Sequence, residues 1–87
     1  MAARCVMLTD SGAVKSGPGM LVSAVLTASG AAQISVKDGG ASGTEFLGMR
    51  LGGAGTVVFA PCMPVAFGAS LYLTVDSGTV EVSLVYV

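Results

Sequence analysis

The chain of 87 residues contains no histidine and no tryptophan, and it has only four basic and five acidic residues. Without histidine it lacks the usual general base and one of the commonest zinc ligands. Serines and threonines are frequent but have no histidine base, and a serine–lysine pair would have only Lys15 or Lys37 to draw on. The residue content therefore predicts a protein that is not an enzyme, with no catalytic residue, no metal site and no cofactor.

Charge is also too sparse to direct the chain to a charged partner. The net charge is −1, and the basic residues form no cluster or stripe, so we expect no nucleic-acid partner. The acids are spread singly, mostly beside glycine, and are typical of turns. Asp76 and Glu81 flank one expected hairpin, where they are predicted to stay solvated.

Cysteine is scarce, and long apolar helices are absent. Cys5 and Cys62 are the two cysteines, fewer than small secreted domains usually carry, and we expect two free, buried thiols. The uncharged stretch 51–75 is long enough to span a bilayer, but its glycines and prolines break any single helix. The apolar residues 20–26 favour an ordinary strand over a secretory leader. We therefore expect no membrane partner and assembly in a cytoplasm.

The apolar residues that are present recur with a period of two, which predicts strands. In 79–87 the side chains of Val80, Val82, Leu84 and Tyr86 point one way. Residues 70–76 and 33–37 alternate in the same manner. In 19–28 the pattern places Met20, Val22, Ala24 and Leu26 on one side, and both sides are half apolar, which predicts burial on two faces.

Turn signals divide the chain into short segments. Asp76-Ser77-Gly78 predicts a tight hairpin between the last two strands, and Asp10-Ser11-Gly12 and Asp38-Gly39-Gly40 are similar turns in which aspartate bonds its own backbone. Residues 48–55 read as a flexible hairpin connection. The predicted fold is all-β, a single small β-sandwich or jelly-roll-like domain over 1–87. Its seven expected antiparallel strands are 4–8, 19–28, 33–37, 45–51, 56–60, 70–76 and 79–87.

The segment 61–68 fits neither a strand nor a polar loop. Two prolines do not suit a central ladder, yet Met63, Val65 and Phe67 are apolar. Two interpretations stay open: a crossover packed over the open end of the sandwich, or a contact surface for a neighbouring subunit.

The apolar content exceeds what one small core hides. Hydrophobic residues make up 53% of the chain, and the mean hydropathy is +0.83, so a partner subunit is expected to cover the surplus. Tyr72 and Tyr86 suit an interface, and Arg4, Met7 and Leu8 suit an arm that reaches a partner. The candidate interface residues are Arg4, Met7, Leu8, Met63, Val65, Phe67, Tyr72 and Tyr86.

The order of features resembles a known class of protein. The run Thr9–Gly19 leads into a long apolar strand, the loop Asp38–Thr44 follows a short strand, and Pro64–Val75 leads to the closing strand Gly78–Val87. This order resembles the small β-sandwich structural proteins of tailed bacteriophages, including capsid cement (decoration) proteins. The resemblance implies a non-enzymatic sandwich that forms trimers and clamps neighbouring copies of the major capsid protein on the virion surface.

We therefore expect a homotrimeric capsid cement protein, assembled in the bacterial host cytoplasm. Two other functions are compatible with the sequence. One is a head-fibre or tail module that attaches to a host surface. The other is a small-ligand binding module, with 63–67 lining a pocket.

Overall fold

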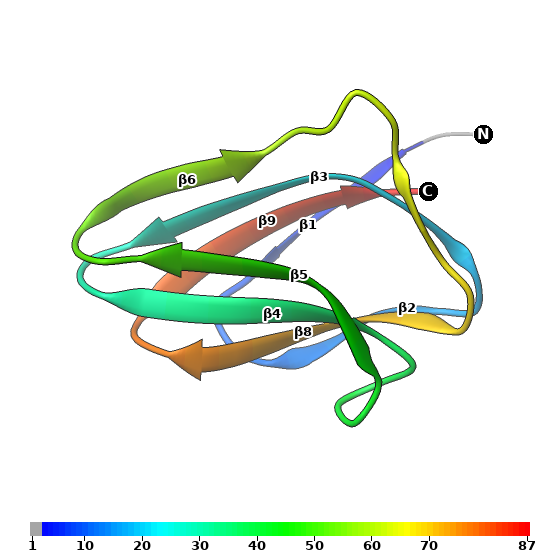
Figure 1. Cartoon of the computed structure of the whole chain (residues 1–87), viewed down its shortest axis with the longest axis horizontal. Coiled ribbons are helices and arrows are strands. Elements are labelled where there is room, and N and C mark those ends of the chain that lie inside the picture. Colours follow the sequence, from blue (N-terminus) through cyan, green and yellow to red (C-terminus); the bar gives the residue numbers. More distant parts are fainter. Residues whose placement is uncertain (1–2) are drawn as a thin grey trace.

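The computed structural model describes residues 3–87, which form nine strands and no helix (Figure 1). In this part of the chain no helix is long and apolar enough to cross a membrane. The expected all-β fold is confirmed, with nine strands rather than seven. The strands are β1 (Arg4–Leu8), β2 (Gly12–Ser16), β3 (Gly19–Ala28), β4 (Ala32–Asp38), β5 (Thr44–Leu51), β6 (Gly55–Phe59), β7 (Val65–Phe67), β8 (Ser70–Ser77) and β9 (Val80–Tyr86).

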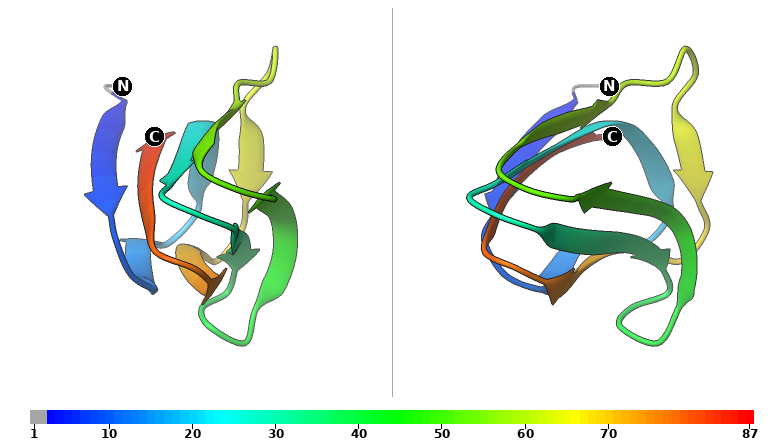
Figure 2. Two further views of the ribbon diagram at one scale, coloured as in Figure 1. Left: turned by 90° about the vertical axis from the view of Figure 1, so that its left-hand side faces the viewer. Right: turned by 60° about the vertical axis from the view of Figure 1, so that its left-hand side comes forward.

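The strands form two antiparallel sheets that pack face to face (Figure 2). Sheet A has the order β1-β9-β3-β6, with β7 also paired to β3, and sheet B has the order β2-β8-β4-β5. In Figure 1 the strands of sheet A occupy the upper half of the view and those of sheet B the lower half. The expected sandwich is therefore confirmed.

The pairing follows a simple rule: the first half of the chain pairs with the second half in reverse order. Strand β1 pairs with β9, β2 with β8, β3 with β6 and β7, and β4 with β5. The chain is thus one long hairpin, closed at the β4–β5 turn and rolled up so that β3 also meets β9 and β4 also meets β8. This is the jelly-roll arrangement.

The core lies between the sheets and is built from alternate side chains, as the period of two predicts. The expected inward residues of β4, β8 and β9 are buried, among them Ile34, Leu73 and Leu84, each 0% exposed. The buried apolar side chains are Leu21, Ala24, Leu26, Ala28, Ala32, Ile34, Val36, Met49, Phe67, Leu71, Leu73, Val80, Val82 and Leu84.

Strand β3 departs from the predicted alternation near its start. Its register against β9 shifts between Leu21 and Ser23, so Val22 is an inserted residue of a β-bulge. The bulge puts Leu21 on the inner side with Ala24 and Leu26, whereas strict alternation had placed it opposite them. The prediction of burial on both faces was wrong, because no third layer covers the outer side: Met20 remains 43% exposed.

Two strands were missed because neither carries an alternating pattern of its own. Strand β2 is short and bulged, since its register against β8 shifts between Ala13 and Lys15. Strand β7 has three residues and lies within the segment 61–68. It pairs with Gly19–Leu21 of β3, beside which β6 pairs with Ala24–Ala28. Residues 60–64 therefore interrupt an edge strand, and Pro61 and Pro64 fall in the interruption.

The link between β8 and β9 is not the predicted hairpin. Strand β8 belongs to sheet B and β9 to sheet A, so Asp76-Ser77-Gly78 crosses from one sheet to the other. The links at Asp10-Ser11 and Gly52-Gly53-Ala54 also cross between the sheets, and of the expected hairpins only that after Asp38 joins paired strands. Asp76 and Glu81 consequently lie in different sheets.

Gly78 is the glycine on which the β8–β9 crossing depends. Its φ is +88°, and an added Cβ would lie 2.5 Å from the carbonyl oxygen of Ala31 and 2.7 Å from the Cβ of Ala32. We expect Gly78→Ala to lower the free energy of unfolding by roughly 2 kcal/mol, because strain and overlap coincide. Gly52→Ala is the matched control: nothing lies within 4 Å of its Cβ position, and it should change urea denaturation little. Equal midpoints for the two variants would contradict this role of Gly78.

Candidate interaction surface

The outer side of sheet A carries fewer charged side chains than the outer side of sheet B. Register pairing places its outward side chains in rows across the strands. The central row runs from Met7 on β1 through Ser83 and Val25 to Val58 on β6. The neighbouring rows are Cys5, Val85 and Ser23 on one side and Glu81, Thr27 and Thr56 on the other.

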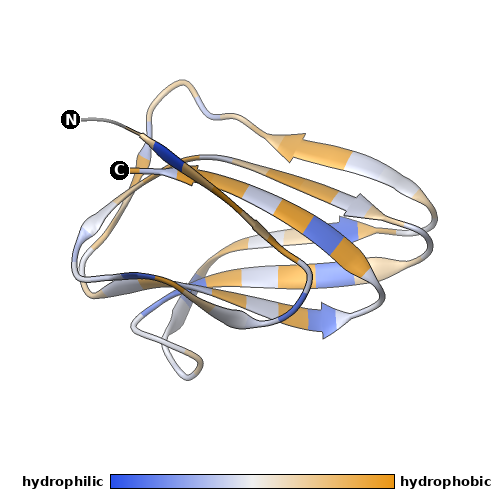
Figure 3. Cartoon of the chain, turned by 180° about the vertical axis from the view of Figure 1, so that it is seen from behind, coloured by the Kyte–Doolittle hydropathy of each residue, from blue (hydrophilic) through white to orange (hydrophobic). Residues whose placement is uncertain are grey.

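Large apolar side chains are exposed on this side. Met7 is 62% exposed, Val58 59% and Met20 43%. Glu81 is the one charged residue in the three rows, where it lies in the last row. Figure 3 shows most of each strand of this sheet in orange or pale colours. An apolar centre with hydroxyls and a charge at its margin has the composition of a protein–protein interface.

The outer side of sheet B has the opposite character. Its rows pair Lys37 with Glu45 and Gln33 with Arg50, and the Arg50 guanidinium donates a 3.4 Å hydrogen bond to Gln33 Oε1. Tyr72 lies beside Lys37 in the first of these rows. This side is charged and hydrogen-bonded, so it needs no partner to cover it.

A buried serine on sheet B is engaged by a carboxylate. Ser35 is 3% exposed, and its hydroxyl donates a 2.5 Å hydrogen bond to Asp76 Oδ2. Asp76 is the extra residue of a bulge against β4, which lets its side chain turn toward Ser35. Thr74 Oγ1, on the same side, is buried without a hydrogen-bond partner in residues 3–87. A carboxylate without histidine is a weak base for a serine hydroxyl, so this pair holds the sheet together and is not an activated nucleophile.

Asp38 ties the two sheets together at the closed end of the rolled hairpin. Its carboxylate accepts hydrogen bonds from the backbone N–H groups of Gly68 at 2.8 Å, Ala69 at 2.8 Å and Ser70 at 3.1 Å. Gly39 N–H in turn donates to Ser70 Oγ at 3.2 Å. The predicted local turn around Asp38 is present, but its side chain bonds the distant β7–β8 link and not its own backbone. The three N–H donors lower the pKa of Asp38, the bond from Gly68 having the largest effect and burial opposing it.

An apolar hollow of about 440 Å³ opens at one end of the sandwich. Met20, Ala66, Phe67 and Val87 line it. The Lys15 ammonium, at its wall, donates to the carbonyl oxygens of Pro18 at 2.6 Å and Val87 at 3.5 Å and lies 5.9 Å from the centre of the Phe67 ring. Lys15 is thereby held by the backbone around the hollow.

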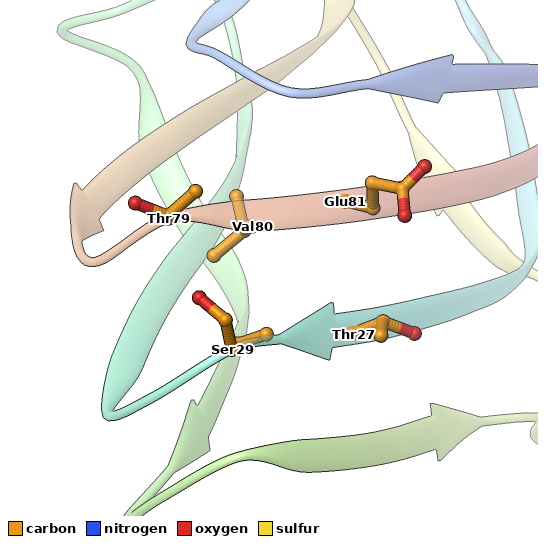
Figure 4. Close-up of a pocket in the computed structure, with 6 residues that line it drawn as sticks. Thr27, Ser29, Thr79, Val80 and Glu81 are labelled. Carbon is orange, nitrogen blue, oxygen red and sulfur yellow. The ribbon is translucent and has the colours of Figure 1, made fainter.

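A smaller hollow of about 260 Å³ lies at the other end of sheet A. Figure 4 shows Thr27 from β3, Val80 and Glu81 from β9, and Ser29 and Thr79 from the adjoining links. The lining of this hollow includes the carboxylate of Glu81 and the hydroxyl groups of Thr27, Ser29 and Thr79. Such a set can accept hydrogen bonds from a polar group, but it contains no nucleophile with a base.

The structure scatters the predicted interface residues. Met7 is exposed on edge strand β1, at one end of the central row of sheet A, and Met63 is 77% exposed in the β6–β7 link. Arg4 is exposed at the first residue of β1, while Leu8 is half-buried against the core. Val65 is half-buried in β7.

The aromatic candidates lie elsewhere. Phe67 is 2% exposed and belongs to the core, where it also lines the apolar hollow. Tyr86 packs half-buried against the core. Tyr86 and Glu81 are both on β9 in sheet A, whereas Tyr72 is on β8 in sheet B, so the two tyrosines do not lie on one hairpin.

Sequence reasoning missed Val25, Val58 and Val85, which complete the apolar outer rows of sheet A. A signal was present, because both sides of 19–28 are half apolar and Val85 interrupts the polar side of the last strand. This pattern predicts burial of both faces of the strand, but in the structure the second apolar face is the outer side of sheet A.

The cysteines are free but exposed, so the prediction of buried thiols was wrong. Cys5 points outward because it alternates with the inward Val6 on an edge strand, and Cys62 lies in the β6–β7 link. Among residues 3–87 no three His, Cys, Asp or Glu side chains lie close enough together to hold a metal ion.

No protein-family model, no curated protein and no solved structure matches the chain.

The pKa shift of Asp38 predicts how stability depends on pH. Because folding lowers this pKa, the three hydrogen bonds to its carboxylate stabilise the fold above the unfolded pKa of about 4. This stabilisation is lost as the pH falls through the lower folded value. Asp38→Asn should therefore be less stable than the native chain at pH 7, and the difference should shrink in acid.

Urea denaturation of both proteins at pH 7 and pH 2.5 measures the effect. Asp10→Asn is the control, since within residues 3–87 Asp10 accepts a hydrogen bond from the local Ser11 N–H alone, at 2.8 Å. A difference between Asp38→Asn and the native chain that is the same at both pH values would refute the carboxylate's role.

Proposed function

We propose that this chain is a non-enzymatic structural module that associates with itself and stabilises a larger protein shell, as a capsid cement protein of a tailed bacteriophage. The observation that carries the proposal is the unequal polarity of the two outer sides of the sandwich. Met7, Val25 and Val58 lie in one uncharged row across sheet A, whereas the outer side of sheet B pairs Lys37 with Glu45 and sets Arg50 beside Gln33. An exposed apolar surface of this kind is typical of a protein that binds another protein.

Two further features support a structural role. The buried serine and the most strongly held carboxylate, Ser35 and Asp38, are both committed to hydrogen bonds that hold strands together. The resemblance of the sequence to phage cement proteins supplies the class of partner, the major capsid protein, and the virion surface as the location. Each contact of a small module is weak, but many identical contacts on one shell add through effective concentration.

Self-association is tested by the native mass of the purified chain. Light scattering on a sizing column should show an oligomer at several concentrations; a trimer of the 8.5 kDa chain would be about three times that mass. Met7→Lys should weaken association about tenfold or more, because it places a charge on an exposed apolar position at the β1 end of this row. Ala13→Lys, at an exposed position of β2 in sheet B, is the matched control and should leave the oligomer intact. A native monomer, or an equal effect of both variants, would refute self-association through sheet A.

The role in the virion is tested with particles that lack the chain. If it is a cement protein, phage particles assembled without it should release their DNA at a lower temperature than complete particles, and added purified chain should restore the difference. Particles that keep their thermal stability but no longer adsorb to host cells would instead favour the head-fibre or tail module.

The apolar hollow supports a second candidate, the small-ligand binding module. Its volume of about 440 Å³ lies within the range of small-molecule sites, and Ala66 and Phe67 from the segment 61–68 line it. A ligand that fills it would raise the unfolding temperature of a monomer. A stable monomer whose unfolding temperature rises with added octanoate would favour this function over assembly.

A further inference from the structure

The edge strands of the sandwich differ in how they are protected. Sheet A ends in β1 on one side and in β6 and β7 on the other, and sheet B ends in β2 and β5. Every edge strand leaves half of its backbone N–H and C=O groups unpaired, and proteins usually shield such edges with charges, bulges or proline. A shielded edge strand is therefore expected to stay unpaired. An unshielded edge strand indicates that a strand of another molecule pairs with it.

Both edges of sheet B are shielded. Strand β2 carries Lys15 and a register shift against β8 between Ala13 and Lys15. Strand β5 carries Glu45 and Arg50, and Phe46 is an extra residue in its register against β4. Charge and irregular backbone both oppose the addition of a further strand at these edges.

Each edge of sheet A carries one open strand, β1 or β6; Pro61 and Pro64 lie beyond the end of β6, in its link to β7. Strand β1 pairs with β9 over five consecutive residues without a register shift, from Arg4 to Leu8. Strand β6 pairs with β3 in the same uninterrupted way, from Gly55 to Phe59. Neither strand contains proline, and their one charge is Arg4, at the first position of β1.

We propose that the two open edges pair with each other between copies of this chain, β1 of one copy with β6 of the next. The inference rests on the proposed self-association and names the strands that perform it. The sheet order β1-β9-β3-β6 is antiparallel at each step, so β6 runs opposite to β1. A second copy that continues the sheet therefore meets β1 with an antiparallel strand of the same length, five residues.

The side chains of the two edges are compatible on both sides of the extended sheet. On the outer side, Cys5 and Met7 would adjoin Thr56 and Val58 of the next copy. On the inner side, the half-buried apolar residues of each strand would meet; these are Val6, Leu8, Val57 and Phe59. The exposed apolar row of sheet A becomes continuous across copies, as in recognition by strand addition.

A second copy is the occupant because each copy supplies both halves of the contact. The contact joins two different edges, so it is heterologous and closes into a ring when the rotation between copies permits. A partner of another kind would use one open edge and leave the other exposed.

Disulfide trapping tests the pairing, since outward residues of adjacent antiparallel strands come within bonding range. Cys5 is an exposed probe on β1. Cys62→Ser removes the other thiol, and Val58→Cys or Thr56→Cys then places a new one on the outer side of β6. After mild oxidation, one of these two variants should give disulfide-linked dimers and higher species on a non-reducing gel. Cys62→Ser/Ala13→Cys, with the new thiol on the shielded edge β2, should give none.

Native mass separates failure of this inference from failure of the proposed function. Ser83→Cys, made with Cys62→Ser, places a thiol in the middle of the outer side of sheet A. An oligomer in which Cys5 forms a disulfide between copies in this variant, and in neither β6 variant, would overturn edge pairing and leave self-association standing. A monomer at all concentrations, with no trapped species, would overturn both. The same variants with Cys5→Ser are the control for specificity: persistence of the higher species without Cys5 would also overturn the pairing.

Discussion

The packing of sheet A on sheet B is the constraint on which the rest of the structure depends. Each strand exposes alternate apolar side chains, and a single sheet has nothing to cover them. Leu26 and Leu84 on one sheet and Ile34 and Leu73 on the other reach 0% exposure because the two sheets cover each other. The many links that cross between the sheets, including the one at Gly78, are consequences of that requirement.

Two polar contacts secure this packing where the backbone changes sheet. Asp38 holds the N–H groups of the β7–β8 link, and Ser11 Oγ accepts a 2.8 Å hydrogen bond from Val75 N–H beside the β1–β2 link. These residues pair backbone groups that the strand ladders leave unpaired. The side chains of Asp38 and Ser11 therefore serve the fold.

The few charged side chains are unevenly divided between the outer sides. Lys37, Glu45 and Arg50 lie on sheet B, while the outer rows of sheet A retain Glu81 alone among charged residues. The edges follow the same division, because β2 and β5 are bulged and charged and β1 and β6 are regular. Both observations support the proposal that this module assembles through sheet A.

The sequence by itself determined the all-β fold and the inward residues of β4, β8 and β9, because alternation and turn residues are local properties. It could not determine which strands pair. Asp76-Ser77-Gly78 has the composition of a hairpin, yet its flanking strands join different sheets, and the short strands β2 and β7 form only because β8 and β3 offer them partners. For the surface, Met7 was recognisable as a candidate, but its neighbours Val25 and Val58 come from strands distant in sequence. Only the tertiary structure brings them into one row, since register is set by the packing of the two sheets and not by the residues nearby in the chain.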